Sequence, residues 1–173
     1  MEYFMLTQNQ KETDGLSFID MPNREWLGKL KSETPAAFYV RSTEMAEYSD
    51  YIERPAVFIS DSVYRMVKKY DSTVKLGSAV FIDQNNGDQR LYWSLENMEG
   101  NSACISEESK RNKLEFITQL ILDAREIPNQ PLFRAVHGQQ RFTIMRLDLA
   151  ESLLRRGVCG FQLQPVAIVR GEH

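Results

Sequence analysis

Short apolar runs separated by polar turns make up most of this chain, and their pattern predicts a domain rich in β-strands. Alternating or compact apolar segments, which are typical of strands, occur at 2–6, 35–41, 56–60, 78–83, 90–94, 116–124, 131–137 and 141–146. The polar segment between the fourth and fifth runs, QNNGDQ, contains residues that tolerate a positive φ. We therefore expect a β-hairpin there.

Helical spacing is clearest in DSVYRMVKKY, residues 61–70, which follows directly on a strand. Four of its apolar residues fall on one helical face: Val63, Met66, Val67 and Tyr70. A second short helix is expected over 42–55, because Ser42 or Thr43 can cap it and Pro55 can end it. Residues 94–116 contain few apolar side chains and predict a loop, with a short helical piece at 107–116.

The sequence of the helix expected after Asp148 is weakly similar to that of the helix expected after Asp61. When DLAESLLRR is aligned with DSVYRMVKK, apolar pairs and then basic pairs coincide. An acid in the first turn and cations in the last turn each oppose the helix dipole, by about 0.3 to 1 kcal/mol. A glycine follows in both copies, Gly77 or Gly157, and glycine permits the left-handed turn that ends a helix.

This internal similarity, which either duplication or coincidence could produce, predicts two strand–helix–strand units. It also pairs Leu153 and Leu154 with Met66 and Val67, so we expect at least one of these leucines to be fully buried.

Composition supports a folded globular domain, and the pattern of expected strands and helices assigns it to the α+β class. Hydrophobic residues make up 42% of the 173 residues and charged residues 26%, which are ordinary globular proportions. A chain of this length can bury well over half of its unfolded surface. We expect a single domain over 1–173, with a mixed β-sheet, a few packed helices and the two strand–helix–strand units.

The charge and the cysteine content indicate which partners and which cellular compartment to expect. The net charge of -3 supplies no basic field for nucleic acid, and no run approaches the length of about 18 apolar residues that a membrane span needs. Two cysteines, Cys104 and Cys159, are too few for a disulfide scaffold. We therefore expect a cytoplasmic protein with reduced thiols that binds neither nucleic acid nor membrane.

None of the reactive side chains predicts a catalytic, cofactor-binding or metal site. Cys159 would need a base such as His137 to act as a nucleophile, but its apolar flanks in GVCGF favour a buried strand entry. Cys104 is expected to be a small apolar filler, and His137 to bond nearby backbone in a turn. Asp123 and Glu126 are interpreted as solvated turn acids. Phosphate-binding and hydrolase motifs are missing from the sequence.

The segment STEMAEYSDYIE carries an acid at every third position, with aromatic and apolar residues between. A three-residue step drifts by about 60° on a helix, so part of the acidic set must face water. One interpretation is a solvated helix packed through its apolar positions. The other is a partner-binding face, formed by Glu44, Glu47, Tyr48, Asp50 and Tyr51. Ten acids and six bases lie in residues 1–56, and this acidic half would steer a basic partner.

Four segments together resemble bacterial domains once of unknown function and later grouped with the immunity proteins of polymorphic toxin systems. They are YSDYIERPAVFISDSVYRMVKKY, then YW, then LILDAREIPNQPLFRAV, then RLDLAESLLRRGVCGFQLQPV. The resemblance covers about residues 40–168, so it implies a family-like core at 41–168 after an N-terminal strand and loop region at 1–40. It implies a small cytoplasmic protein that binds and neutralises a toxin domain, and it carries no active-site residues.

We therefore expect a non-enzymatic immunity protein whose partner is a cognate toxin, and two alternatives stay open. An enzyme of unrecognised type would have a deep pocket converging on His137, Cys159 or Asp123. A structural or regulatory module that forms a homo-oligomer would have a symmetric apolar self-contact.

Overall fold

The computed structural model describes residues 1–9, 16–43 and 48–170, and it has the expected α+β fold. The contacts of the chain divide into two compact units. Unit 1 comprises Met1–Thr7, Glu99–Ser152 and Leu163–His173, and unit 2 comprises Gln8–Met98 and Leu153–Gln162. Because these segments alternate along the chain, the division does not cut the sequence into consecutive domains, and the expectation of a single domain stays a prediction.

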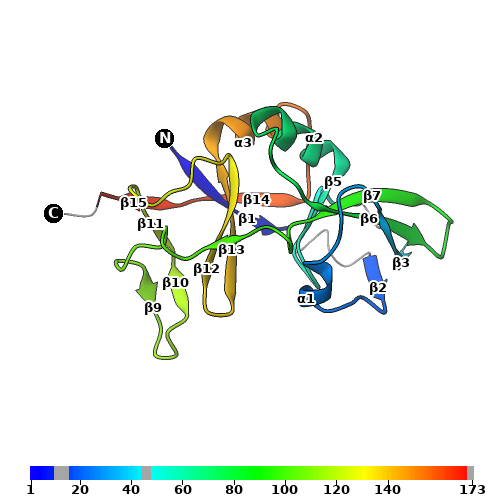
Figure 1. Cartoon of the computed structure of the whole chain (residues 1–173), viewed down its shortest axis with the longest axis horizontal. Coiled ribbons are helices and arrows are strands. Elements are labelled where there is room, and N and C mark those ends of the chain that lie inside the picture. Colours follow the sequence, from blue (N-terminus) through cyan, green and yellow to red (C-terminus); the bar gives the residue numbers. More distant parts are fainter. Residues whose placement is uncertain (10–15, 44–47, 171–173) are drawn as a thin grey trace. The chain divides into compact units, whose positions relative to one another are not determined.

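Unit 2 is built on a six-stranded mixed sheet with the order β2-β3-β6-β7-β5-β4 (Figure 1). Its strands are β2 (Leu16–Ile19), β3 (Ala36–Ser42), β4 (Tyr51–Ile52), β5 (Phe58–Ser60), β6 (Gly77–Asp83) and β7 (Gln89–Ser94). β3 and β6 pair in parallel, and the other neighbours pair antiparallel. β6 and β7 form the expected hairpin.

Helix α2 (Asp61–Tyr70) confirms the helical pattern at the predicted residues. The side chain of Ser60 caps it by accepting from the Val63 N–H, and Val63, Met66 and Val67 are buried. The expected glycine stop is wrong here, because Asp71 caps the end of α2 and Gly77 is the first residue of β6. Gly77 instead permits close packing, since a Cβ at this position would collide with the Leu30 side chain.

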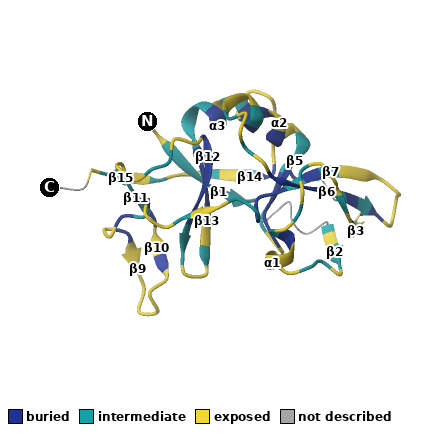
Figure 2. Ribbon diagram, in the orientation of Figure 1, coloured by how far each residue is buried: buried dark blue, intermediate teal, exposed yellow. Residues whose placement is uncertain are grey.

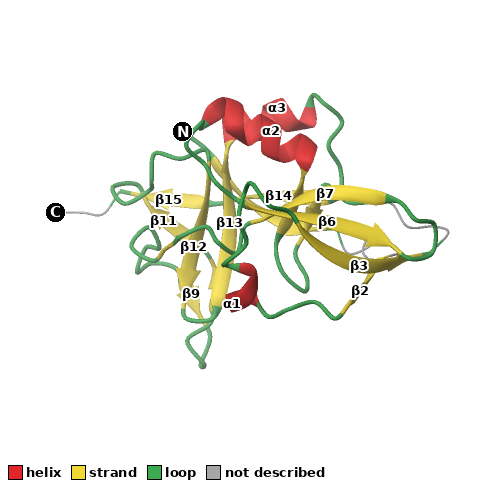
Figure 3. Ribbon diagram, turned by 45° about the vertical axis from the view of Figure 1, so that its right-hand side comes forward, coloured by secondary structure: helices red, strands yellow, loops and turns green. Residues whose placement is uncertain are grey.

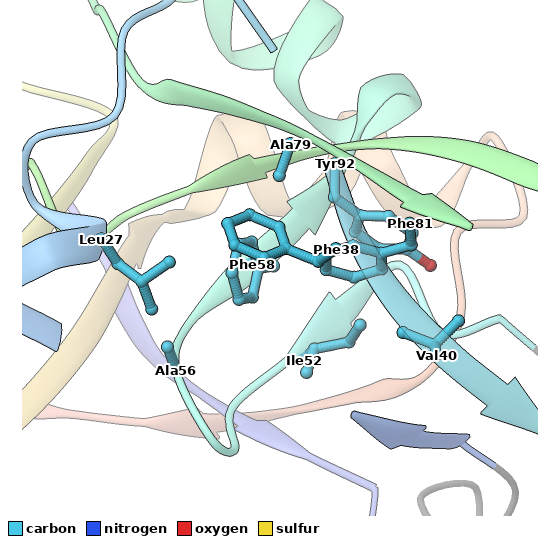
Figure 4. Close-up of a cluster of buried hydrophobic side chains, with 9 residues drawn as sticks. All are labelled: Leu27, Phe38, Val40, Ile52, Ala56, Phe58, Ala79, Phe81 and Tyr92. Carbon is cyan, nitrogen blue, oxygen red and sulfur yellow. The ribbon is translucent and has the colours of Figure 1, made fainter. Parts of the chain in front are cut away.

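An aromatic cluster forms the core of unit 2 on one face of this sheet (Figure 4). Phe81 lies at its centre, with ring centroids 5.1 Å from Phe18, 5.1 Å from Phe58 and 4.5 Å from Tyr92. Leu27, from the short helix α1 (Arg24–Leu27), also belongs to this cluster. The alternating strand pattern therefore places large apolar side chains on the buried face, as period-two alternation requires.

A five-stranded sheet with the order β14-β1-β13-β12-β8 supplies most of unit 1. Its strands are β1 (Tyr3–Gln8), β8 (Gly100–Asn101), β12 (Leu132–His137), β13 (Gln140–Arg146) and β14 (Phe161–Pro165). Two further strand pairs are β9 (Lys110–Arg111) with β10 (Ile117–Gln119), and β11 (Ile121–Asp123) with β15 (Ala167–Val169). The helical piece expected at 107–116 is wrong, because Lys110–Arg111 pairs as a strand with Ile117–Gln119.

Helix α3 (Leu147–Leu154) completes the second strand–helix–strand unit, between β13 and β14. Leu153 is 0% exposed and Leu154 is 55% exposed, which confirms that one of the two leucines is buried. Gly157 has a φ of +70°, so the left-handed turn expected after this helix is present. No helix in the described part of the chain is both long enough and apolar enough to cross a membrane.

The helix expected over 42–55 is wrong for the described residues 48–55, where Tyr51–Ile52 forms strand β4 instead. Two effects explain the difference. The Ser49 hydroxyl donates to the Tyr51 carbonyl and lies 3.3 Å from the Tyr51 amide nitrogen, and such local bonds compete with helical ones. Tyr51 and Ile52 are also buried through pairing with β5.

Candidate functional site

The side chain of Asp50, predicted to face a partner, forms hydrogen bonds with two other segments of unit 2. One carboxylate oxygen accepts from the Ser60 hydroxyl at 2.6 Å, and the other accepts from the Cys159 N–H at 2.9 Å. The Asp50 N–H also donates to the Cys159 carbonyl at 3.1 Å. Asp50 therefore joins the start of α2 to the turn that precedes β14.

The two tyrosines of the predicted partner-binding face pack within unit 2. Tyr51 is 1% exposed, so its side chain is not accessible to a partner. The Tyr48 hydroxyl donates to Asp83 at 2.8 Å, and the Arg90 guanidinium lies 4.0 Å from the Tyr48 ring centroid. Tyr48 also packs against the aromatic core. Glu44 and Glu47 lie outside the described residues, so their contribution to an interface stays a prediction.

Asp83 accepts several hydrogen bonds in this region and is fully buried at the end of β6. Its carboxylate accepts from the Ser42 N–H at 3.3 Å and the Asn85 N–H at 2.9 Å, as well as from Tyr48. Hydrogen bonds from the Ser42 side chain, and then from these other donors, lower the pKa of Asp83 to about 2. These hydrogen bonds hold the β6–β7 turn in place, so Asp83 has a structural role.

Burial raises the pKa of the Tyr48 hydroxyl to about 12, and the hydrogen bond to the Asp83 carboxylate adds to the shift. A neutral phenol bonded to an ionised carboxylate is the stable arrangement at neutral pH. Tyr48 therefore acts as a fixed hydrogen-bond donor to Asp83.

The two cysteines differ in accessibility. Cys104 is 0% exposed, which confirms it as an apolar filler, and burial raises the pKa of its thiol to about 11. Cys159 is exposed, so the expected buried strand entry is wrong. The reason lies in Gly160, whose φ of +88° makes a turn before β14 begins at Phe161. A side chain at Gly160 would collide with Ser49, so glycine is the buried residue of this turn.

The remaining candidate groups occupy structural positions in unit 1. The Nε2 atom of His137 lies 2.9 Å from the Glu115 carbonyl, which confirms a backbone bond, although that residue is distant in sequence. Asp123 bonds Arg125 at 2.8 Å, and this contact lowers the pKa of Asp123 to about 2. Glu126 is exposed. Among the described residues, no three His, Cys, Asp or Glu side chains gather in a group that could hold a metal ion.

The unit 2 sheet has a second face that α2 covers only in part (Figures 1 and 3). Strand pairing arranges this face in rows, because paired residues share a face. In the first row, Ile59 pairs with Trp93, and the Tyr64 ring of α2 stacks on Trp93 at 3.9 Å. Ile59 is 1% exposed, so α2 shields this row.

The next two rows are not buried in this way. In one row Val80 pairs with Ala37 and Leu91, and in the other Tyr39 pairs with Ile19 and Ile82. Tyr39 is 49% exposed and Ala37 is exposed, while the other four are half-buried. We call these six residues the open sheet face: Ile19, Ala37, Tyr39, Val80, Ile82 and Leu91.

Arg41 borders the open sheet face, two residues beyond Tyr39 on the same strand. It is exposed, and its Nε donates to the Gln84 side chain at 3.4 Å. Tyrosine and arginine are enriched among the residues that dominate protein interfaces. The alternation in PAAFYVR could have indicated this surface, since Phe38 and Val40 face the core while Tyr39 and Arg41 face outward.

Comparison of the whole chain with models of known protein families found no match. A search of curated proteins found no significant match either. The open sheet face is therefore interpreted from its own residues.

Proposed function

We propose that this chain is a non-enzymatic binding protein that neutralises a cognate bacterial toxin domain, as an immunity protein does. The observation that carries the proposal is the open sheet face, where Tyr39 is 49% exposed beside aliphatic residues and Arg41. The resemblance of the four sequence segments to immunity proteins supports the choice of a toxin as the partner. Cys104 and Cys159 are not joined in a disulfide, which supports a reducing compartment, and we propose that the protein acts in the cytoplasm.

Burial of the open sheet face against a partner would remove apolar surface from water. Each 100 Å² of apolar area contributes about 2.5 kcal/mol, from which the cost of association must be subtracted. A rigid sheet loses little conformational entropy on binding. Tyr39 would serve as the aromatic anchor of the interface, and Arg41 would contribute directional hydrogen bonds at its border.

The test uses the toxin domain encoded by the neighbouring gene. The protein should restore growth to cells that express this domain and should bind it in surface-binding kinetics. Tyr39→Ala should increase the dissociation rate constant by about tenfold or more, as expected for an interface anchor.

Tyr70→Ala is the matched control, because Tyr70 is a 37% exposed tyrosine at the end of α2, outside the open sheet face. Its dissociation rate should equal that of the unmodified protein. Equal rates for Tyr39→Ala and Tyr70→Ala would remove the open sheet face from the interface. A neighbouring gene product that neither binds nor is neutralised would refute the proposed function.

A further inference from the structure

The loop between β9 and β10 in unit 1 is held in one conformation by its own residues. The Asn112 side chain accepts from the Leu114 N–H at 2.9 Å and the Phe116 N–H at 3.0 Å. The Asn112 N–H donates to the Phe116 carbonyl at 2.9 Å, and its carbonyl accepts from the Glu115 N–H at 3.0 Å. We call residues 112–116 the tip loop.

The β12–β13 hairpin supports the tip loop from the side. The Gln140 side chain accepts from the Ile117 N–H at 2.7 Å and donates to the Ile117 carbonyl at 3.1 Å, as a neighbouring strand would. His137 contacts the Glu115 carbonyl at 2.9 Å. The loop is thus held by its own hydrogen bonds and by this hairpin, so ordering it on binding would cost little.

The chain between β9 and β10 is coloured as exposed in Figure 2, and two residues of the tip loop are large and apolar. Leu114 is 76% exposed and Phe116 is 45% exposed. Between them, Glu115 has a φ of +62°, a left-handed conformation that costs a non-glycine residue about 1 kcal/mol or more. Strained backbone residues of this kind cluster at ligand-binding and switch regions.

The charge around the tip loop is opposite in sign to that of the whole chain. Residues 109–119 contain three cations, Lys110, Arg111 and Lys113, and one acid, Glu115, for a local net charge of +2. The whole chain has a net charge of -3. Arg111 and Glu115 approach to 3.6 Å, and Lys110 and Lys113 are exposed. The complementary surface is an apolar pocket bordered by acidic groups.

We propose that the tip loop is a second anchor, which inserts Leu114 and Phe116 into an apolar, acid-bordered pocket on the partner protein. The inference rests on the proposed function for the identity of that partner, the toxin domain. A protein pocket suits the loop better than a lipid bilayer does. The Glu115 side chain is 75% exposed between the two apolar residues, and membrane insertion would carry its carboxylate toward the hydrocarbon region.

The experiment measures binding of the neighbour-encoded toxin domain to two double variants. Leu114→Ser with Phe116→Ser should increase the dissociation rate constant about tenfold or more, without lowering the melting temperature. Lys110→Glu with Lys113→Glu should mainly slow association, by several-fold, and weaken its dependence on salt. Leu154→Ser is the matched control, because Leu154 is a 55% exposed leucine outside the loop, and it should bind as the unmodified protein does.

The outcomes separate the two proposals. If the unmodified protein binds the toxin and both double variants bind it with unchanged rates, the tip loop is not an anchor and the proposed function survives. If the unmodified protein does not bind, both proposals fall. Co-sedimentation with vesicles of equal phosphatidylglycerol and phosphatidylcholine tests the other occupant. Binding to these vesicles that the serine variant abolishes would overturn the protein pocket in favour of lipid.

Discussion

Phe81→Ala should destabilise unit 2 more than any change on its surface, because this ring is the centre of the aromatic core. Phe81 is 0% exposed, and its ring lies 4.5 Å from Tyr92 and 5.1 Å from both Phe18 and Phe58. Truncating a buried phenylalanine costs about 3 to 5 kcal/mol, and each aromatic pair contributes about 0.5 to 1.5 kcal/mol beyond the area it buries. Because several such pairs are lost at once, we expect Phe81→Ala to lower the free energy of unfolding by about 4 to 5 kcal/mol.

Urea unfolding followed by tryptophan fluorescence measures this loss. Both tryptophans report on unit 2, because Trp26 packs against Phe38 and Trp93 stacks on Tyr64. The midpoint should fall without a change in the m-value, and Tyr39→Ala should shift the free energy of unfolding by no more than about 0.5 kcal/mol. A loss below about 1 kcal/mol for Phe81→Ala would refute the placement of this ring at the core centre.

Three further predictions concern an acid, a pair of leucines and the two cysteines. The pKa of Asp83 is lowered from 3.8 to about 2, so its stabilising effect is present above about pH 4 and is lost as the pH falls through 2. Asp83→Asn should therefore be less stable at pH 7 and lose less stability between pH 4 and pH 2 in urea titrations, and equal slopes for both proteins would contradict this. Leu153→Ala should cost about 2 to 5 kcal/mol and Leu154→Ala no more than about 0.5 kcal/mol, and similar melting temperatures for the two variants would be inconsistent with the structure. Iodoacetamide should modify Cys159 in the native protein without loss of binding and leave Cys104 unmodified, as intact-mass measurement would detect; modification of Cys104 first would contradict the burial of that thiol.

Local signals in the sequence were sufficient to predict α2 and the β6–β7 hairpin. Asp61 in the first turn, the basic pair in the last turn and apolar spacing on one face all favoured the same helix, and the structure contains it. For residues 48–55 the local signals were overridden by tertiary contacts. Tyr51 pairs with Ile59 of β5, a strand that lies outside the segment predicted as a helix.

Sequence reasoning also missed the internal contacts of Asp50, Tyr48 and Tyr51, while the interface role of Glu44 and Glu47 stays a prediction. Asp50 accepts a hydrogen bond from Cys159, which lies more than 100 residues away in sequence. This structural role could not be recognised from the segment alone. The alternation around Tyr39 predicted a strand with two faces. It could not predict that α2 would shield Trp93 on the outward face and leave Tyr39 exposed.

The most direct test of the proposed function is the dissociation rate constant of the complex between this chain and the neighbour-encoded toxin domain. The unmodified protein should form a stable complex, and Tyr39→Ala should dissociate about tenfold faster or more, while Tyr70→Ala leaves the rate unchanged. A toxin domain that forms no complex with the unmodified protein would contradict the immunity function itself.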